Sequence, residues 1–269
     1  IYDKKQNTVI LCRDRTGQKP IFYSLVDNHT IIFSSSLKAI VSTGLVNKEI
    51  DQEDMKYILF NEYAPIGNSG IRGIKSVRPA EIVSWQLGNQ RLTKDKYWEW
   101  DIGKSEFETR PTFEPLKRNV FHELEKSVQD ELISDVPVGI FLSGGIDSAI
   151  LTSIAVKYSS EKLSTFSMAF NDKELDESNA SNYIARKLKT DHTIVNFENE
   201  FKNDILDKVF NSLDIPLGDS SYLPTFLLCQ AASKSHKCIL SGDGGDELFG
   251  GYSTYRAHKI LRGYELLFP

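Results

Sequence analysis

The chain has 269 residues, of which 40% are hydrophobic and 26% charged, a composition typical of one large globular domain or two smaller ones. Its formal net charge of −5 and its lack of any basic run argue against nucleic acid as a partner. The longest apolar runs, such as residues 138–142, are far too short to span a bilayer, so no membrane association is expected. Cys12, Cys229 and Cys238 are odd in number and lack metal-ligand spacing, which favours a reduced, cytoplasmic compartment.

The first hundred residues predict mostly antiparallel β structure. Two strand-like runs, TVILCRD and PIFYSLVDNHTIIFSSS, are separated by a turn. Further on, EIVSWQL and QRLTKDKYWEW predict a hairpin that turns at Gly88 and Asn89. Between these pairs, residues 51–61 predict a short helix capped by Asp51.

A polar stretch over residues 101–115 predicts a linker between a domain at 1–100 and a second domain at 116–269. The second domain opens with a helix in which apolar residues recur every four positions from Leu116 to Leu132. Strands then alternate with helices; strands are expected at 138–142, 163–170, 193–197 and 237–240, and helices near 147–158, 177–188 and 223–233, with another ending near 213. This alternation predicts a doubly wound parallel α/β sheet, which binds ligands at the carboxyl ends of its strands.

The run VGIFLSGGIDSAIL is typical of a strand, a glycine-rich turn and a helix. Gly144 and Gly145 allow backbone N–H groups to approach an anion, and Ser143 and Ser148 add hydroxyl groups. The turn contains no lysine, and it carries Asp147, a carboxylate, where a phosphate would lie. A tight turn in which Asp147 caps the helix is the structural alternative.

A second run, CILSGDGGDELFGGY, repeats this pattern and carries Asp243 and Asp246. If both strands are parallel, the two loops meet at the same edge of the sheet. Two carboxylates beside a polyphosphate would repel it unless a divalent cation lay between them, and Mg²⁺ commonly takes one or two carboxylates plus phosphate oxygens. Asp147 and Asp246 are therefore the candidate Mg²⁺ ligands. A calcium loop is less favoured because the dense alternating acids of such loops are missing.

These runs resemble a known family. SGGIDS resembles the pyrophosphate-binding loop of the ATP pyrophosphatases. LSGDGGDELFGGY, together with TFSMAF, LDES and DIPLGDSSYLPTFLL in the same order, is similar to the glutamine-hydrolysing asparagine synthetases. RDRTGQKPIFY and FSSSLKAI resemble the later part of the glutaminase domain of that family. The resemblance covers nearly the whole chain. It implies an adenine nucleotide α-hydrolase-like sheet preceded by the antiparallel part of an αββα glutaminase domain (amidotransferase type 2).

The resemblance also implies a reaction, its cofactors and its site. Aspartate is converted to asparagine through β-aspartyl-AMP with release of pyrophosphate, using ATP, Mg²⁺ and ammonia derived from glutamine. The implied ATP or pyrophosphate contacts are Leu142, Ser143, Gly144, Gly145, Asp147, Ser148, Met168, Ser241 and Gly242, with Asp147 and Asp246 as Mg²⁺ ligands and Asp243 as the catalytic residue. An interior strand position is the alternative for Met168. Asp219 and Ser220 are either a wall of the acidic-substrate pocket or a cap of the following helix.

The chain departs from the family at its first residue, which is Ile where a glutaminase of this type has a nucleophilic Cys. Cys12 lies within a strand-like run and has no free α-amine. The synthetase part is also expected to continue beyond Pro269, so we interpret the chain as a fragment without glutaminase activity. The expected partners are small molecules, namely ATP, aspartate and glutamine or ammonia, and a homodimer is left open.

Several alternatives remain at this point. A relative that amidates another carboxylate, such as a sugar acid or a β-lactam precursor, would have the same loops. A nucleotide-binding homologue without turnover is the third hypothesis. Arg13, Asp14 and Arg15 are interpreted as an ion network in a hairpin turn. His192 is interpreted as a surface or capping residue without a functional role.

Overall fold

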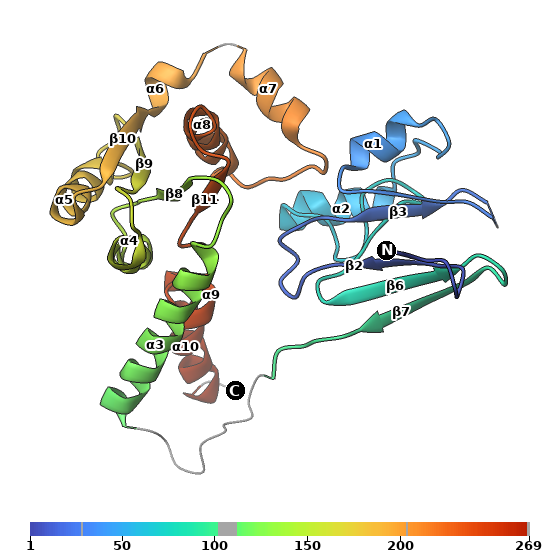
Figure 1. Ribbon diagram of the computed structural model, residues 1–269, viewed down its shortest axis with the longest axis horizontal. Coiled ribbons are helices and arrows are strands. Elements are labelled where there is room, and N and C mark those ends of the chain that lie inside the picture. Colours follow the sequence, from blue (N-terminus) through green and yellow to red (C-terminus); the bar gives the residue numbers. More distant parts are fainter. Residues whose placement is uncertain (28, 102–111, 203, 268–269) are drawn as a thin grey trace. The chain divides into compact units, whose positions relative to one another are not determined.

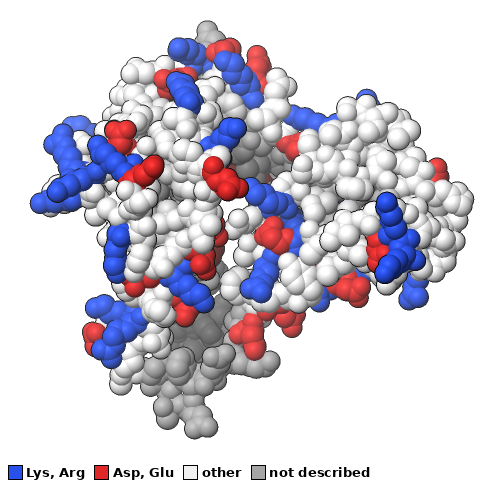
Figure 2. Space-filling view, viewed as in Figure 1, with Lys and Arg blue, Asp and Glu red and all other residues white. Residues whose placement is uncertain are grey.

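The computed structural model describes residues 1–27, 29–101, 112–202 and 204–267; for residues 259 and 262–267 it describes the backbone alone. Two compact units make up the chain: Ile1–Glu108 with Asp204–Ser220, and Thr109–Asn203 with Ser221–Pro269. No helix in the described ranges combines the length and the apolar character that crossing a bilayer would need. On the face shown in Figure 2, Lys and Arg side chains are interspersed with Asp and Glu side chains.

The N-terminal unit contains two antiparallel sheets and short helices. Its elements are β1 (Tyr2–Asp3), β2 (Thr8–Cys12), β3 (Phe22–Leu25), β4 (Ile31–Ser34), α1 (Leu37–Ser42), α2 (Gln52–Asn61), β5 (Lys75–Ser76), β6 (Glu81–Gln86), β7 (Arg91–Lys96) and α7 (Ile205–Ser212). One sheet has the order β1-β2-β6-β7 and the other β4-β3-β5. In Figure 1, β3 lies between α1 and the sheet of β2, β6 and β7.

The two faces of β3 explain this layering. Side chains alternate along a strand, so successive residues point to opposite faces. Tyr23 packs with Leu11 and Val83 between the two sheets, whereas Phe22 packs with Leu37 of α1 on the other face. The mostly antiparallel architecture predicted for this region is therefore confirmed, although α1 was not expected.

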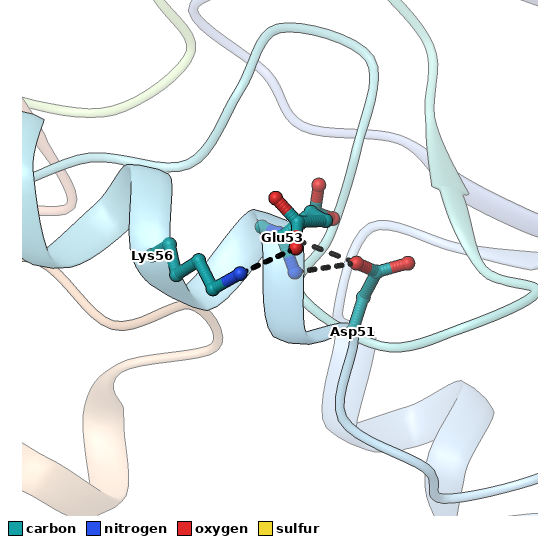
Figure 3. Close-up of polar contacts among 4 residues, drawn as sticks. Asp51, Glu53 and Lys56 are labelled. Atoms are coloured by element: carbon teal, nitrogen blue, oxygen red, sulfur yellow. Dashed lines mark hydrogen bonds and ion pairs between the residues drawn. The ribbon is translucent and has the colours of Figure 1, made fainter.

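The expected hairpin and the expected helix cap are both present. Strands β6 and β7 pair in register from Glu81 opposite Lys96 to Gln86 opposite Arg91. At the start of α2, Asp51 Oδ1 accepts hydrogen bonds from the backbone N–H groups of Glu53 (3.1 Å) and Asp54 (3.3 Å), as Figure 3 shows. These bonds satisfy two of the N–H groups that a helix leaves without intrahelical partners.

The turn after β2 is held by bonds to the backbone rather than by the expected ion network. The Arg13 guanidinium donates to the carbonyl oxygens of Gly17 (2.6 Å) and Val77 (2.8 Å). The Asp14 carboxylate accepts from the N–H groups of Gln18 (2.9 Å) and Lys19 (3.0 Å). Partial desolvation alone would raise the pKa of Asp14, but the N–H donors outweigh it and lower the pKa to about 2.

The C-terminal unit is the expected parallel α/β sheet. Its elements are α3 (Phe113–Glu131), β8 (Val138–Phe141), α4 (Ile146–Tyr158), β9 (Ser164–Ala169), α5 (Ser178–Leu188), β10 (Asp191–Asn196), α6 (Phe197–Glu200), α8 (Tyr222–Ala232), β11 (Cys238–Leu240), α9 (Gly245–Phe249) and α10 (Ser253–Leu267). The strand order is β10-β9-β8-β11 and every pair is parallel. The chain moves outward from β8 to β9 and β10 and then returns to the other side of β8. The strand order thus reverses between β8 and β11, where sheets of this kind bind ligands.

Two helix boundaries and the burial of one apolar stripe differ from the expectation. Helix α3 begins at Phe113, so Pro115 lies in its first turn, where a missing N–H costs no intrahelical bond. The rest of the expected linker, residues 102–111, lies outside the described residues. The single helix expected to end near 213 is two helices, α6 and α7, and the second belongs to the N-terminal unit. The apolar stripe of α3 is only partly used, because Val128 is buried while Leu116 is 40% exposed.

The capping geometry of α2 predicts the effect of Asp51→Ala. Loss of the cap should lower the free energy of unfolding by about 1 kcal/mol. Glu53→Ala is the matched control, because it removes only the exposed ion pair with Lys56 (2.6 Å), which contributes at most about 0.5 kcal/mol. Urea unfolding of the three proteins measures the difference, and equal losses in both variants would contradict the capping role.

Candidate active site

The loop between β8 and α4 is held by its own serine side chains. The Ser148 hydroxyl accepts a hydrogen bond from the backbone N–H of Ser143 (3.1 Å) and lies 2.8 Å from the Ser143 hydroxyl. Ser143 Oγ in turn accepts from the N–H of Gly145 (3.1 Å). Ser148 is buried at the start of α4, so the loop is tied to the positive end of that helix. Such a loop is suited to binding an anion.

The loop after β11 touches the first loop through positions that have no side chain. A Cβ atom on Gly245 would lie 2.7 Å from Asp147 Oδ2, and one on Gly242 would lie 3.2 Å from Asp147 Cβ. A Cβ atom on Gly251 would overlap the Asp246 carboxylate. Glycine at these positions lets the backbone of the second loop approach the two carboxylates. The N-cap residue of α4 is Gly145, so Asp147 lies in the first turn of the helix and not at its N-cap position.

Both loops line one cavity of about 800 Å³. It contains most of the expected site residues: Leu142, Ser143, Gly145, Asp147, Ser148, Met168, Ser241, Gly242, Asp243 and Asp246. Gly144 is not among the lining residues, and its N–H donates to Glu177 Oε2 at 3.0 Å. The parallel pairing of β8 with β11 therefore places the two motifs side by side, as their sequences predicted.

The charges on the cavity wall are all of one sign. Asp147, Glu177, Asp243 and Asp246 line it, and no lysine or arginine does so within the described residues. No group of three or more His, Cys, Asp or Glu side chains in the same described part is arranged to hold a metal ion. An anionic ligand would be repelled here unless a cation accompanied it, and Asp147 and Asp246 could supply the one or two carboxylates that Mg²⁺ takes beside phosphate oxygens.

The second loop contains two local bonds that orient its acids. The Ser241 hydroxyl donates to Asp243 Oδ2 at 2.8 Å. The Tyr252 hydroxyl donates to Glu247 Oε1 at 2.8 Å, and this bond, with some desolvation, raises the pKa of Tyr252 to about 12. The Ser241 bond orients Asp243, whose side chain lines the cavity.

Asp219 and Ser220 are not among the residues that line this cavity, and their role in a substrate pocket stays a prediction. They end the segment Asp204–Ser220, which belongs to the N-terminal unit. In that segment Asp214 Oδ1 accepts hydrogen bonds from the Ser36 hydroxyl and the Lys38 N–H, both at 3.0 Å, and so caps α1. The Lys38 ammonium in turn donates to the Asn211 carbonyl (2.5 Å) at the end of α7. Each helix end is therefore capped by a side chain from the other segment.

The interpretation of His192 as a surface or capping residue is wrong. Its Nδ1 lies 2.9 Å from the Thr165 hydroxyl and its Nε2 lies 3.2 Å from the Ser167 hydroxyl. Thr165 and Ser167 are buried on β9, and Ser181 of α5 donates to Ser167 at 3.1 Å. Ser167 and Ser181 also line the cavity. His192, which is half-buried, therefore closes a hydrogen-bond chain behind the cavity wall.

Two functional features were missed from the sequence, although each left a signal. Thr165 and Ser167 are polar residues with period two in an otherwise apolar strand, a pattern that calls for a buried polar partner such as His192. Glu177 stands in the run LDES, just before a helix and after a strand that ends at the cavity edge. The sequence shows only where the run LDES lies between strand and helix. The bond between Glu177 and Gly144 depends on the fold.

The chain around His192 predicts a loss of stability in His192→Ala. The Thr165 and Ser167 hydroxyls would each lose a partner, which should cost about 2 kcal/mol. His122→Ala, at an exposed position of α3, is the control and should change the free energy of unfolding by less than about 0.5 kcal/mol.

The same bonds predict the pH dependence. Burial lowers the pKa of His192, against a smaller opposing effect of its bond to Thr165. The unfolded chain therefore binds a proton at a pH where the folded chain does not. The His192 contribution is complete above about pH 6.5 and declines as the pH falls through the lowered folded value. Urea unfolding of the wild type and of His192→Ala at a series of pH values measures this contribution. A difference in unfolding free energy between the two proteins that grows toward low pH would contradict the prediction.

Comparison with known proteins agrees with this architecture. Residues 119–269 match the family model described as asparagine synthase, and residues 1–98 match the glutamine amidotransferase domain. A putative glutamine-hydrolysing asparagine synthetase 2 of Methanocaldococcus jannaschii is 32% identical over 100% of this chain and 50% of its own length. Asparagine synthetase 1 of Bacillus subtilis is 30% identical over 98% of this chain and 41% of its own length.

The chain is also similar, at lower identity, to proteins with other names. Amidase chyE of Penicillium rubens is 25% identical over 97% of this chain and 40% of its own length. An NH3-dependent NAD synthetase from Campylobacter jejuni shares 18% identity over 51% of this chain and 60% of that chain with a TM-score of 0.36, too low to bear on function. The chain spans about half the length, or less, of the curated relatives it matches. With the synthase model matching more than half of its residues, this chain belongs to the asparagine synthase family.

Proposed function

We propose that the protein from which this chain comes converts aspartate to asparagine through β-aspartyl-AMP, using ATP and releasing pyrophosphate. The observation that supports this most is the meeting of two glycine-rich, acid-bearing loops at the point where the strand order reverses. A lysine-free loop at a helix N-terminus suits retention of a departing pyrophosphate. The glutamine amidotransferase match supports ammonia supply from glutamine in the parent.

The first step joins the aspartate β-carboxylate oxygen to the α-phosphorus of ATP and breaks the bond to the bridging oxygen, so pyrophosphate leaves. Ser143, Gly145 and Ser148, with the first N–H groups of α4, hold the negative charge that develops on pyrophosphate. Gly144 contributes the close approach of the loop to α5 rather than a free donor. Leu142, Met168, Ser241 and Gly242 line the remaining wall and would contact adenosine.

In the second step, ammonia attacks the acyl carbon and AMP leaves, and one proton must be removed from the nitrogen. We assign removal of that proton to Asp243, because its carboxylate lines the cavity and is oriented by Ser241. Asp147 and Asp246 would hold Mg²⁺, since they are carboxylates in a cavity without lining cations. When bound, Mg²⁺ supplies positive charge that offsets the charge of the polyphosphate.

One competing function has its own support. The similarity to fungal amidases over nearly the whole chain keeps open a different acceptor acid, such as a sugar acid or a β-lactam precursor. The loops that bind ATP would be the same, so the acceptor has to be found by offering a panel of carboxylic acids to the parent protein. Binding of ATP without exchange in the presence of any acid would instead favour a homologue without turnover.

Exchange of labelled pyrophosphate into ATP, measured on the parent protein, tests the proposal. The exchange should require aspartate and Mg²⁺, and Asp147→Ala and Asp246→Ala should each lower it at least about 100-fold, as expected when charge stabilisation in a transition state is lost. Asp130→Ala, which removes an exposed carboxylate of α3 outside the cavity, should leave the rate unchanged. Wild-type exchange in both cavity variants would overturn the metal assignment, and exchange with another acid but not aspartate would overturn the substrate.

A further inference from the structure

Two consecutive acids tie the start of α5 to the ends of two neighbouring strands. Asp176 Oδ1 accepts hydrogen bonds from the backbone N–H groups of Phe170 (3.3 Å), just after β9, and of Ser178 (3.1 Å). Glu177 Oε2 accepts from the N–H of Gly144 (3.0 Å), in the loop after β8. Both strand ends form part of the cavity edge, so this pair of acids joins three segments that build the site.

The packing around Gly144 supports the same connection independently. A Cβ atom at this position would lie 2.8 Å from Ala180 Cβ and 3.1 Å from Glu177 Cβ. A contact as short as 2.8 Å is essentially never seen for a Cβ atom, so the loop can lie this close to the first turn of α5 because residue 144 is glycine. The Gly144 N–H is thereby directed toward Glu177.

Glu177 remains in a wall that already holds Asp147, Asp243 and Asp246. Its negative charge opposes binding of a polyphosphate, but its bond to a backbone N–H is of the stronger, charge-assisted kind. We propose that Glu177 is a positioning residue which holds the loop 143–148 in its anion-binding conformation, with Asp176 anchoring the start of α5. The clamp formed by these two residues holds the loop at the N-terminus of α4, on the wall of the cavity in which the ligand would bind. This inference rests on the proposed function, because the ligand of the loop is taken to be ATP.

Three substitutions separate the geometry of Glu177 from its charge. Glu177→Gln keeps an oxygen acceptor at the same reach without the charge, Glu177→Asp keeps the charge but shortens the side chain by one methylene, and Glu177→Ala removes both. Glu174→Ala is the control, because Glu174 is an exposed acid of the same segment outside the cavity. The readouts are hydrogen exchange of the Gly144 amide, resolved at single residues without nucleotide, and the Kd for ATP in the presence of Mg²⁺.

The clamp predicts that acceptor geometry decides both readouts. Loss of one hydrogen bond should speed exchange of the Gly144 amide about tenfold and raise the Kd for ATP about 5- to 10-fold in Glu177→Ala and Glu177→Asp. Glu177→Gln should stay within about threefold of wild type, and Glu174→Ala should match it.

Other outcomes would overturn the clamp. If Glu177→Gln and Glu177→Ala both bind ATP more tightly, Glu177 competes with the ligand and does not position the loop. Unchanged exchange in Glu177→Ala and Glu177→Asp would show that the loop does not depend on the bond. If Glu177→Ala fails to fold, the pair Glu177→Gln and Glu177→Asp still decides between geometry and charge. A wild-type chain that does not bind ATP would count against the proposed function, and the exchange comparison, made without nucleotide, would still test the clamp.

Discussion

The site depends on one close approach, between the backbone of the loop after β11 and the side chain of Asp147. Gly242 and Gly245 have no Cβ, and a Cβ at either would lie within 3.2 Å of Asp147 atoms. The approach is possible because β8 and β11 are parallel neighbours although about a hundred residues separate them in the chain. The reversal of strand order sets this pairing and creates the crevice in which both loops end.

The loop after β8 is held by hydrogen bonds, and the cavity that it lines carries several negative charges. Ser143 and Ser148 satisfy each other and the loop backbone, while Glu177 takes the Gly144 N–H. The cavity that results carries carboxylates and no lining lysine or arginine among the described residues. A fold that concentrates like charges in this way loses stability through their repulsion, and that loss is understandable if a ligand brings its own cations.

Much of the C-terminal unit was predictable because its signals are local. Short apolar runs followed by glycine-rich turns and amphipathic helices led to a parallel sheet, and the strands lie within one or two residues of their expected positions. The helix was expected to begin after Pro115, but it begins at Phe113, because proline is as acceptable in the first turn of a helix as in a linker. His192 was misjudged because its partners are on β9, and no local pattern shows which strand will lie beside it.

The sequence alone determined the two loop motifs, the residue types in them, the order of the elements and the family resemblance. Those features belong to single segments or to their order along the chain, and each can be recognised without knowing which other segment packs against it. Only the tertiary structure decided that Glu177 faces Gly144, that His192 closes a chain to Ser167, and that Asp204–Ser220 packs with the N-terminal unit. These contacts join residues from separate elements, and their formation depends on strand order and on the absence of a Cβ at a few glycines, neither of which a single segment reveals.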